Sequence, residues 1–107
     1  MATVSGMPAV NDPDEPPKEP VVVGVIPYDP RRGLISDWDD DTVLRIEVLE
    51  TTAKTILISG NAAGLTSLAR HLLTLAQPSA PAGSHLDFDD YCGWFEEGSF
   101  GVRIELE

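Results

Sequence analysis

Alternation of apolar and polar residues predicts the strands of this chain. Residues 43–50 alternate with one apolar face, residues 54–59 return after a turn, and residues 100–107 show the most regular pattern. Residues 84–90 also alternate, and residues 21–26 form a short β-branched run that ends at a proline. Successive side chains of a strand point to opposite faces, so each alternating stretch is expected to bury one face. The expected inward residues include Ile56, Ile58 and Phe100.

Apolar residues at spacings of three and four predict one helix after Asn61. They form one stripe, at Leu65, Leu68, Ala69, Leu72, Leu73 and Ala76. The other side of the helix is polar and carries Ser67, Arg70, His71 and Thr74. We expect the apolar stripe to be buried, because an amphipathic helix turns its apolar face to the core. Asn61 is suited to cap the first turn, and Pro78 prevents the helix from continuing.

The order of these elements predicts an α+β fold. Three strands precede the helix and two follow it, which gives the order β-β-β-α-β-β. A mostly antiparallel sheet of four to five strands, with the helix packed on one face, would bury every apolar stripe. The opposite face would be open to solvent and carry charged and polar residues: Arg45, Glu47, His85, Asp87, Asp89, Arg103 and Glu105.

Residues 1–20 differ in composition from the rest of the chain. They hold most of its prolines and several acidic residues, and they have few apolar side chains with which to form a core. Such a segment cannot offset its ordering entropy, so a disordered tail over 1–20 and a single domain over 21–107 are expected. The stretch from Pro13 to Pro16 matches PxxP, which leaves a proline-rich ligand for another domain as an alternative.

The net charge of −11, from 18 acidic and 7 basic residues, narrows the class of partner. Backbone-driven nucleic-acid binding needs a basic surface, and so does binding to an anionic membrane. We therefore expect neither nucleic acid nor a membrane as a direct partner. No apolar run reaches the roughly 18 residues of a membrane span, and the first residues do not resemble a secretory signal. With Cys92 as the single cysteine no intramolecular disulfide can form, and a cytoplasmic location is expected.

Candidate catalytic and metal-binding chemistry is sparse. His71 and His85 are too few for a metal site and are expected to be structural or surface residues. A small hydrolase stays an alternative, either with Cys92 paired with His85, for which no third orienting group is evident, or with a pair of carboxylates. The run from Gly60 to Gly64 precedes a helix as phosphate loops do, but a helix-cap turn fits it better. We therefore expect no catalytic residues, no cofactor and no metal.

Acidic residues gather in three clusters, at 37–41, 87–90 and 96–97, and residues 54–80 carry no aspartate or glutamate. A solvated face is one interpretation, and a binding surface for a basic partner is the other. The second gains support from the aromatic residues that flank the clusters, because aromatic anchors inside a charged rim are typical of interfaces. These are Trp38, Tyr91, Trp94 and Phe95.

Several short motifs in residues 56–106 resemble the immunity protein 32 family of bacterial polymorphic-toxin systems. They are Ile58-Ser-Gly-Asn61, Gly64-Leu65, Leu68-Ala69, Leu72-Leu73, Leu75-Ala76, Ser84-His85-Leu86-Asp87, Glu97-Gly98-Ser99 and Ile104-Glu105-Leu106. The resemblance implies a cytosolic, non-enzymatic inhibitor that neutralises a toxin domain by binding it. It implies no catalytic residues.

Charge and resemblance together give a hypothesis for the contact surface. We expect a basic toxin domain to be bound by the open face and the adjoining turn, with these contact residues: His85, Asp87, Asp89, Trp94, Glu96 and Glu97. The alternative is a small accessory or adaptor domain, with a homodimer that pairs through the strand at 21–26.

Overall fold

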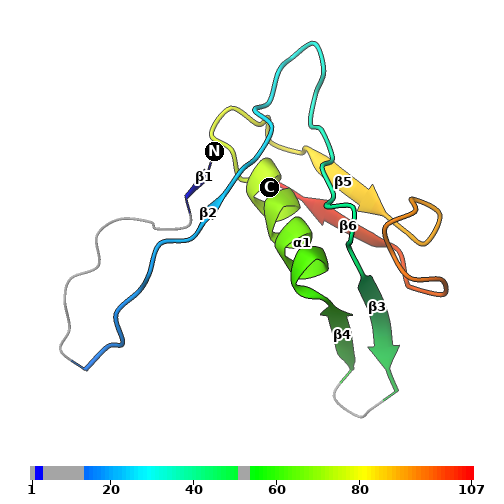
Figure 1. The fold of residues 1–107 in the computed structure, drawn as a ribbon. Coiled ribbons are helices and arrows are strands. Elements are labelled where there is room, and N and C mark those ends of the chain that lie inside the picture. The colour runs from blue at the N-terminus through cyan, green and yellow to red at the C-terminus, as the bar shows by residue number, and fades with distance from the viewer. Residues whose placement is uncertain (1, 4–13, 51–53) are drawn as a thin grey trace.

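The computed structural model describes residues 2–3, 14–50 and 54–107, and it has an α+β fold (Figure 1). The elements follow the order β1 (Ala2–Thr3), β2 (Val22–Val23), β3 (Leu44–Leu49), β4 (Thr55–Gly60), α1 (Ala62–Leu75), β5 (His85–Phe88) and β6 (Val102–Glu105). Residues 4–13 of the predicted disordered tail lie outside the described residues, and residues 14–20 are exposed.

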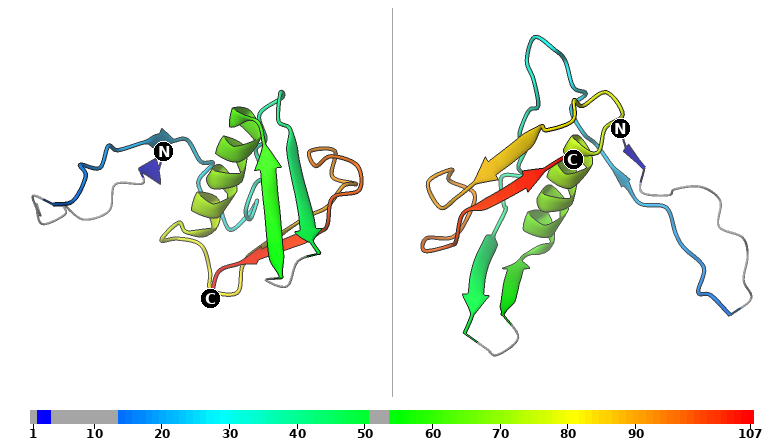
Figure 2. Two further views of the ribbon diagram at one scale, coloured as in Figure 1. Left: turned by 90° about the horizontal axis from the view of Figure 1, so that it is seen from below. Right: turned by 180° about the vertical axis from the view of Figure 1, so that it is seen from behind.

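The strands form three separate antiparallel pairs, β1–β2, β3–β4 and β5–β6. The predicted single sheet of four to five strands is therefore wrong. Figure 2 shows the β3–β4 and β5–β6 hairpins running in different directions instead of side by side. Of the predicted strand over 21–26, only Val22–Val23 pairs, and it does so with Ala2–Thr3.

The second edge of β3 is occupied by the segment 96–100, which is not a strand. The Glu96 amide donates to the Leu44 carbonyl at 2.8 Å, and the Phe100 amide donates to the Ile46 carbonyl at 3.0 Å. These bonds satisfy backbone groups of β3 that a neighbouring strand would otherwise pair with. The hairpins are thus joined through this irregular segment, which is why no continuous sheet forms.

The core lies between the two hairpins, α1 and the segment that precedes β3. Its buried members are Trp38, Leu44, Ile46, Leu75, Leu86, Phe88 and Phe95. Leu68, Val102 and Ile104 pack against it as half-buried residues. Leu44 and Ile46 of β3, and Leu86 and Phe88 of β5, thus lie on the inward faces that alternation predicts.

Helix α1 is turned the opposite way from the sequence-based prediction. Ser67, His71 and Thr74, from the polar side, are almost completely buried, whereas Leu65 and Leu72 are 46% and 47% exposed. The expectation that the leucine stripe forms the centre of the core is therefore wrong. Ile56 and Ile58 of β4 and Phe100 were also expected inside, and all three are exposed.

The acidic segment at 37–41 explains the orientation of α1, because it packs on the polar side of the helix. The Asp37 amide donates to His71 Nε2 and the Asp39 amide donates to Ser67 Oγ, each at 3.0 Å. Backbone amides that leave water need acceptors, and the polar side chains of α1 supply them. Trp38 lies between these two amides in sequence and enters the core. A polar helix face is thus buried at little cost.

Candidate functional site

Strand β5 places His85 and Asp87 on its exposed face, while Leu86 and Phe88 point to the core. The register sets His85 opposite Glu105 and Asp87 opposite Arg103 on β6. Part of the predicted open face is therefore present on the β5–β6 hairpin.

Asp87 is engaged by Arg103. The guanidinium Nε and Nη2 atoms donate to Oδ1 and Oδ2 of the carboxylate at 2.7 and 3.3 Å, and His85 Nε2 lies 3.5 Å from Oδ2. The hydrogen bond from Arg103 lowers the pKa of Asp87 below its usual value, and the same bond raises the pKa of Arg103. The charge of Asp87 is thus balanced within the hairpin, and Asp87 is a weaker source of negative potential than its neighbours.

The loop after β5 is held by its own carboxylates. Asp89 Oδ1 accepts the Tyr91 amide at 2.9 Å, and Asp90 Oδ2 accepts the Gly98 amide at 3.1 Å. Gly93 and Gly98 have φ values of 86° and 83°, a conformation that suits glycine. The Asp90 bond brings the two ends of the loop together. Asp90 was not among the predicted contact residues, although the run Asp87-Phe-Asp-Asp90 already contained it.

Trp94 and Glu96 attach the loop to the core. Trp94 is half-buried and stacks on Trp38 with ring centroids 6.3 Å apart, while the Glu96 amide bonds to β3 as described above. Asp89 and Glu97 are exposed. The segment 87–97 contains no lysine or arginine, and its acidic residues are Asp87, Asp89, Asp90, Glu96 and Glu97. We call these five residues the acidic loop.

The other large acidic cluster, at 37–41, is tied to the fold by Arg70. Its guanidinium donates to the carbonyls of Gly24 and Asp37 at 3.0 Å each and to Asp39 Oδ1 at 3.2 Å. The Arg70 side chain is only 13% exposed. Asp37 and Asp39 therefore contribute to structure through their contacts with Arg70.

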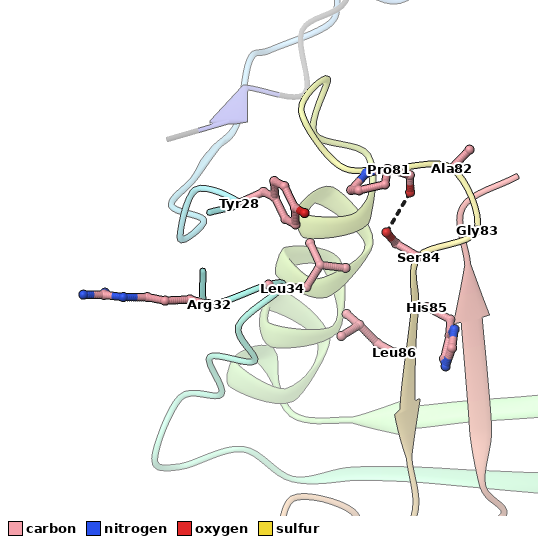
Figure 3. Close-up of a pocket in the computed structure, with 10 residues that line it drawn as sticks. Tyr28, Arg32, Leu34, Pro81, Ala82, Gly83, Ser84, His85 and Leu86 are labelled. Atoms are coloured by element: carbon pink, nitrogen blue, oxygen red, sulfur yellow. Dashed lines mark hydrogen bonds between the residues drawn. The ribbon is translucent and has the colours of Figure 1, made fainter. Parts of the chain in front are cut away.

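An open hollow of about 530 Å³ lies between the segments 28–34 and 81–86 (Figure 3). Figure 3 shows Leu34 and Leu86 on its inner wall and the Ser84 hydroxyl bonded to the Pro81 carbonyl. His85 is among the lining residues, but Cys92 and the five residues of the acidic loop are not. The lining mixes polar and apolar side chains and does not pair His85 with Cys92.

Cys92 and His85, the alternative catalytic pair, bond to different groups. The Cys92 thiol donates to the Asp89 carbonyl at 2.9 Å, and His85 faces Asp87. Within residues 2–3, 14–50 and 54–107, no group of three or more His, Cys, Asp or Glu side chains is placed to hold a metal ion. Over the same residues, no helix has the length and apolar character needed to cross a membrane.

The start of α1 is a tight structural turn. Asn61 Oδ1 accepts the Gly64 amide at 2.7 Å and the Val43 amide at 3.0 Å, which confirms Asn61 as the N-cap. A Cβ atom at Gly60 or Gly64 would collide with the Val43 carbonyl oxygen. The glycines at 60 and 64 are therefore explained by close packing against β3.

Comparison with known proteins identifies a family that part of the chain matches. Residues 55–106 match the family described as Immunity protein 32, in a range that nearly coincides with the 56–106 resemblance. No curated protein and no solved structure matches the chain.

Proposed function

We propose that the protein binds and neutralises a bacterial toxin domain, because residues 55–106 match the Immunity protein 32 family. It acts without a catalytic step of its own, in the cytoplasm, by covering a surface that the toxin needs. The match of residues 55–106 to this family is the observation that carries this proposal.

We place the contact on the acidic loop, together with His85 and Trp94. A net charge of −11 favours a basic partner, and the loop concentrates carboxylates without a neighbouring lysine or arginine in its own segment. Complementary charge steers two proteins together and raises the association rate. Trp94 supplies a partly exposed aromatic side chain beside the carboxylates, a combination found in many interfaces.

Asp89 and Glu97 are the best positions at which to test the charge. Both are exposed, whereas Asp87 is paired with Arg103, so a lysine at 87 would also face Arg103 across the hairpin. Glu15 and Glu19 offer a matched control, because they are exposed acidic residues in the segment before β2.

The experiment first identifies a toxin-like domain encoded beside the gene, and then measures association with it at low and at physiological salt. We expect the variant with Asp89→Lys and Glu97→Lys to associate about tenfold more slowly at low salt. The variant with Glu15→Lys and Glu19→Lys has the same change in net charge, and its association rate should fall much less. An association rate that changes neither with salt nor with the loop substitutions would contradict the placement of the contact. A neighbouring toxin that keeps full activity with the protein in excess would contradict the function itself.

A further inference from the structure

Strand β4 exposes an apolar edge that the fold does not cover. Ile56, Leu57 and Ile58 are 63%, 38% and 48% exposed. Within the part of the chain that the structure describes, β4 pairs only with β3. Figure 1 shows the β3–β4 hairpin extending beyond the start of α1, away from the other elements.

The sequence of β4 lacks the features that protect edge strands from pairing. Natural edge strands are usually interrupted by a charge, a proline or a bulge. The segment from Thr55 to Gly60 contains no charged residue and no proline, and it pairs with β3 residue by residue without a bulge. Such an edge is suited to accept another strand.

The charge distribution leaves β4 as the edge at which a second copy of this chain meets the least repulsion. Two molecules with a net charge of −11 repel each other over most of their surfaces. Residues 54–80 carry no acidic residue, and Lys54 lies directly before β4. A basic toxin would be attracted elsewhere, to the acidic loop, whereas two copies of this acidic chain can approach at β4 with the least repulsion.

The strand is also complementary to itself. An antiparallel pair about a two-fold axis normal to the sheet sets residues of the same face opposite each other. With the axis beside Leu57, Leu57 meets its own copy and Ile56 meets Ile58 twice. Lys54 then lies opposite Gly60, so no like charges are juxtaposed. Cross-strand pairs of this apolar kind stabilise a sheet.

We propose that the protein forms a homodimer in which β4 pairs antiparallel with β4 of a second copy, giving a four-stranded β3–β4–β4–β3 sheet. This interface differs from the one at 21–26 expected for an accessory domain. The proposal does not rest on toxin binding, because it concerns the protein alone.

Sedimentation of the full chain from about 1 µM to about 1 mM tests the dimer. We expect a mass that rises toward twice the 11.5 kDa of one chain and a dimer that tightens with added salt, since salt screens the repulsion. Ile56→Lys should leave a folded monomer, because the side chain is exposed. Val22→Lys, an equal charge change at an exposed residue of β2, should leave the dimer intact. A monomer at every concentration, or a dimer that survives Ile56→Lys but not Val22→Lys, would overturn the proposal.

Cross-linking tests the register. In a Cys92→Ser background, Leu57→Cys should form an intermolecular disulfide under mild oxidation, since directly opposed residues of antiparallel strands lie within disulfide range. Val48→Cys in the same background, on β3, should remain largely uncross-linked. Equal cross-linking of the two variants would contradict pairing through β4.

Discussion

The indole ring of Trp38 stacks on the imidazole ring of His71, with ring centroids 4.2 Å apart and planes inclined by 26°. His71 is fully buried, and both of its ring nitrogens are used. Nε2 accepts the Asp37 amide, so Nδ1 carries the proton and donates to the Ser67 carbonyl at 2.6 Å. The pair joins the acidic segment at 37–41 to the centre of α1, and it requires a neutral histidine.

The first prediction concerns pH. Burial, assisted by the charge of Arg70, lowers the pKa of His71 below 6.5, although the Ser67 carbonyl opposes the shift. A lowered pKa means that the unfolded chain binds the proton first as pH falls. The contribution of His71 to stability is therefore complete above pH 6.5 and decreases as pH falls from there through the lowered value. Urea unfolding at a series of pH values between about 7.5 and 5 measures this loss.

Two variants test the pH prediction: His71→Gln removes the buried histidine, and His85→Gln is the control that removes an exposed one. His71→Gln should be less stable than the parent at neutral pH, but its stability should vary less over the same pH range. His85→Gln removes the exposed histidine on β5 and serves for comparison. An unchanged pH dependence in His71→Gln would contradict the prediction.

The second prediction tests which face of α1 is buried. Leu75 is 3% exposed and Leu72 is 47% exposed. Leu75→Ala should cost about 2–5 kcal/mol of unfolding free energy because it leaves a cavity. Leu72→Ala should cost less than about 1 kcal/mol. Chemical denaturation in dilute solution compares them, and a larger loss for Leu72→Ala would mean that the leucine stripe faces the core after all.

The third prediction concerns Gly64. Alanine is favoured over glycine inside a helix by about 1 kcal/mol, so propensity alone predicts that Gly64→Ala stabilises the protein. The collision of a Cβ atom with the Val43 carbonyl should reverse the sign and destabilise it by about 1–3 kcal/mol. Gly24→Ala is the control, because a Cβ atom there meets no other atom within 4 Å. A higher melting temperature for Gly64→Ala would refute the close packing of α1 on β3.

The fourth prediction concerns Arg70, which donates to acceptors on two segments that precede β3. Arg70→Ala should lower the unfolding free energy by about 1.5–3 kcal/mol, since its bonds are charge-assisted and partly buried. Arg45→Ala breaks an ion pair with Glu47 at a half-exposed site and should cost less than about 1 kcal/mol. Equal losses for the two variants, measured by denaturant unfolding, would show that Arg70 does not hold the segment.

Local sequence patterns predict the helix and strands of this fold better than they predict how these elements pack together. The helix, its Asn61 cap and the inward residues Leu44, Ile46, Leu86 and Phe88 follow from periodicity and capping chemistry, and the structure confirms them. Val48, which alternation also places inside, is 48% exposed, so that part of the prediction is wrong. These features depend on neighbours in the sequence, which a pattern records. The six predicted contact residues remain a prediction.

The orientation of α1 depends on a partner far away in the chain, so periodicity misjudges it. Two signals for it exist in the sequence: Ser67, His71 and Thr74 repeat at spacings of four and three, and Arg70 is a basic residue available to the cluster at 37–41. Each is also consistent with a solvated face. Only the docking of Trp38 between the hairpins decides between the two arrangements.

The bonds that tie residues 96–100 to β3 have a mechanical consequence. A molecule that binds residues 96–100 is also coupled to β3 in the core, because the Glu96 and Phe100 amides are hydrogen-bonded to the Leu44 and Ile46 carbonyls. Binding at residues 96–100 should therefore cost little conformational entropy, because this segment is already held in place. Occupancy there should in turn resist melting of the entire domain, since a ligand of the native state shifts the unfolding equilibrium.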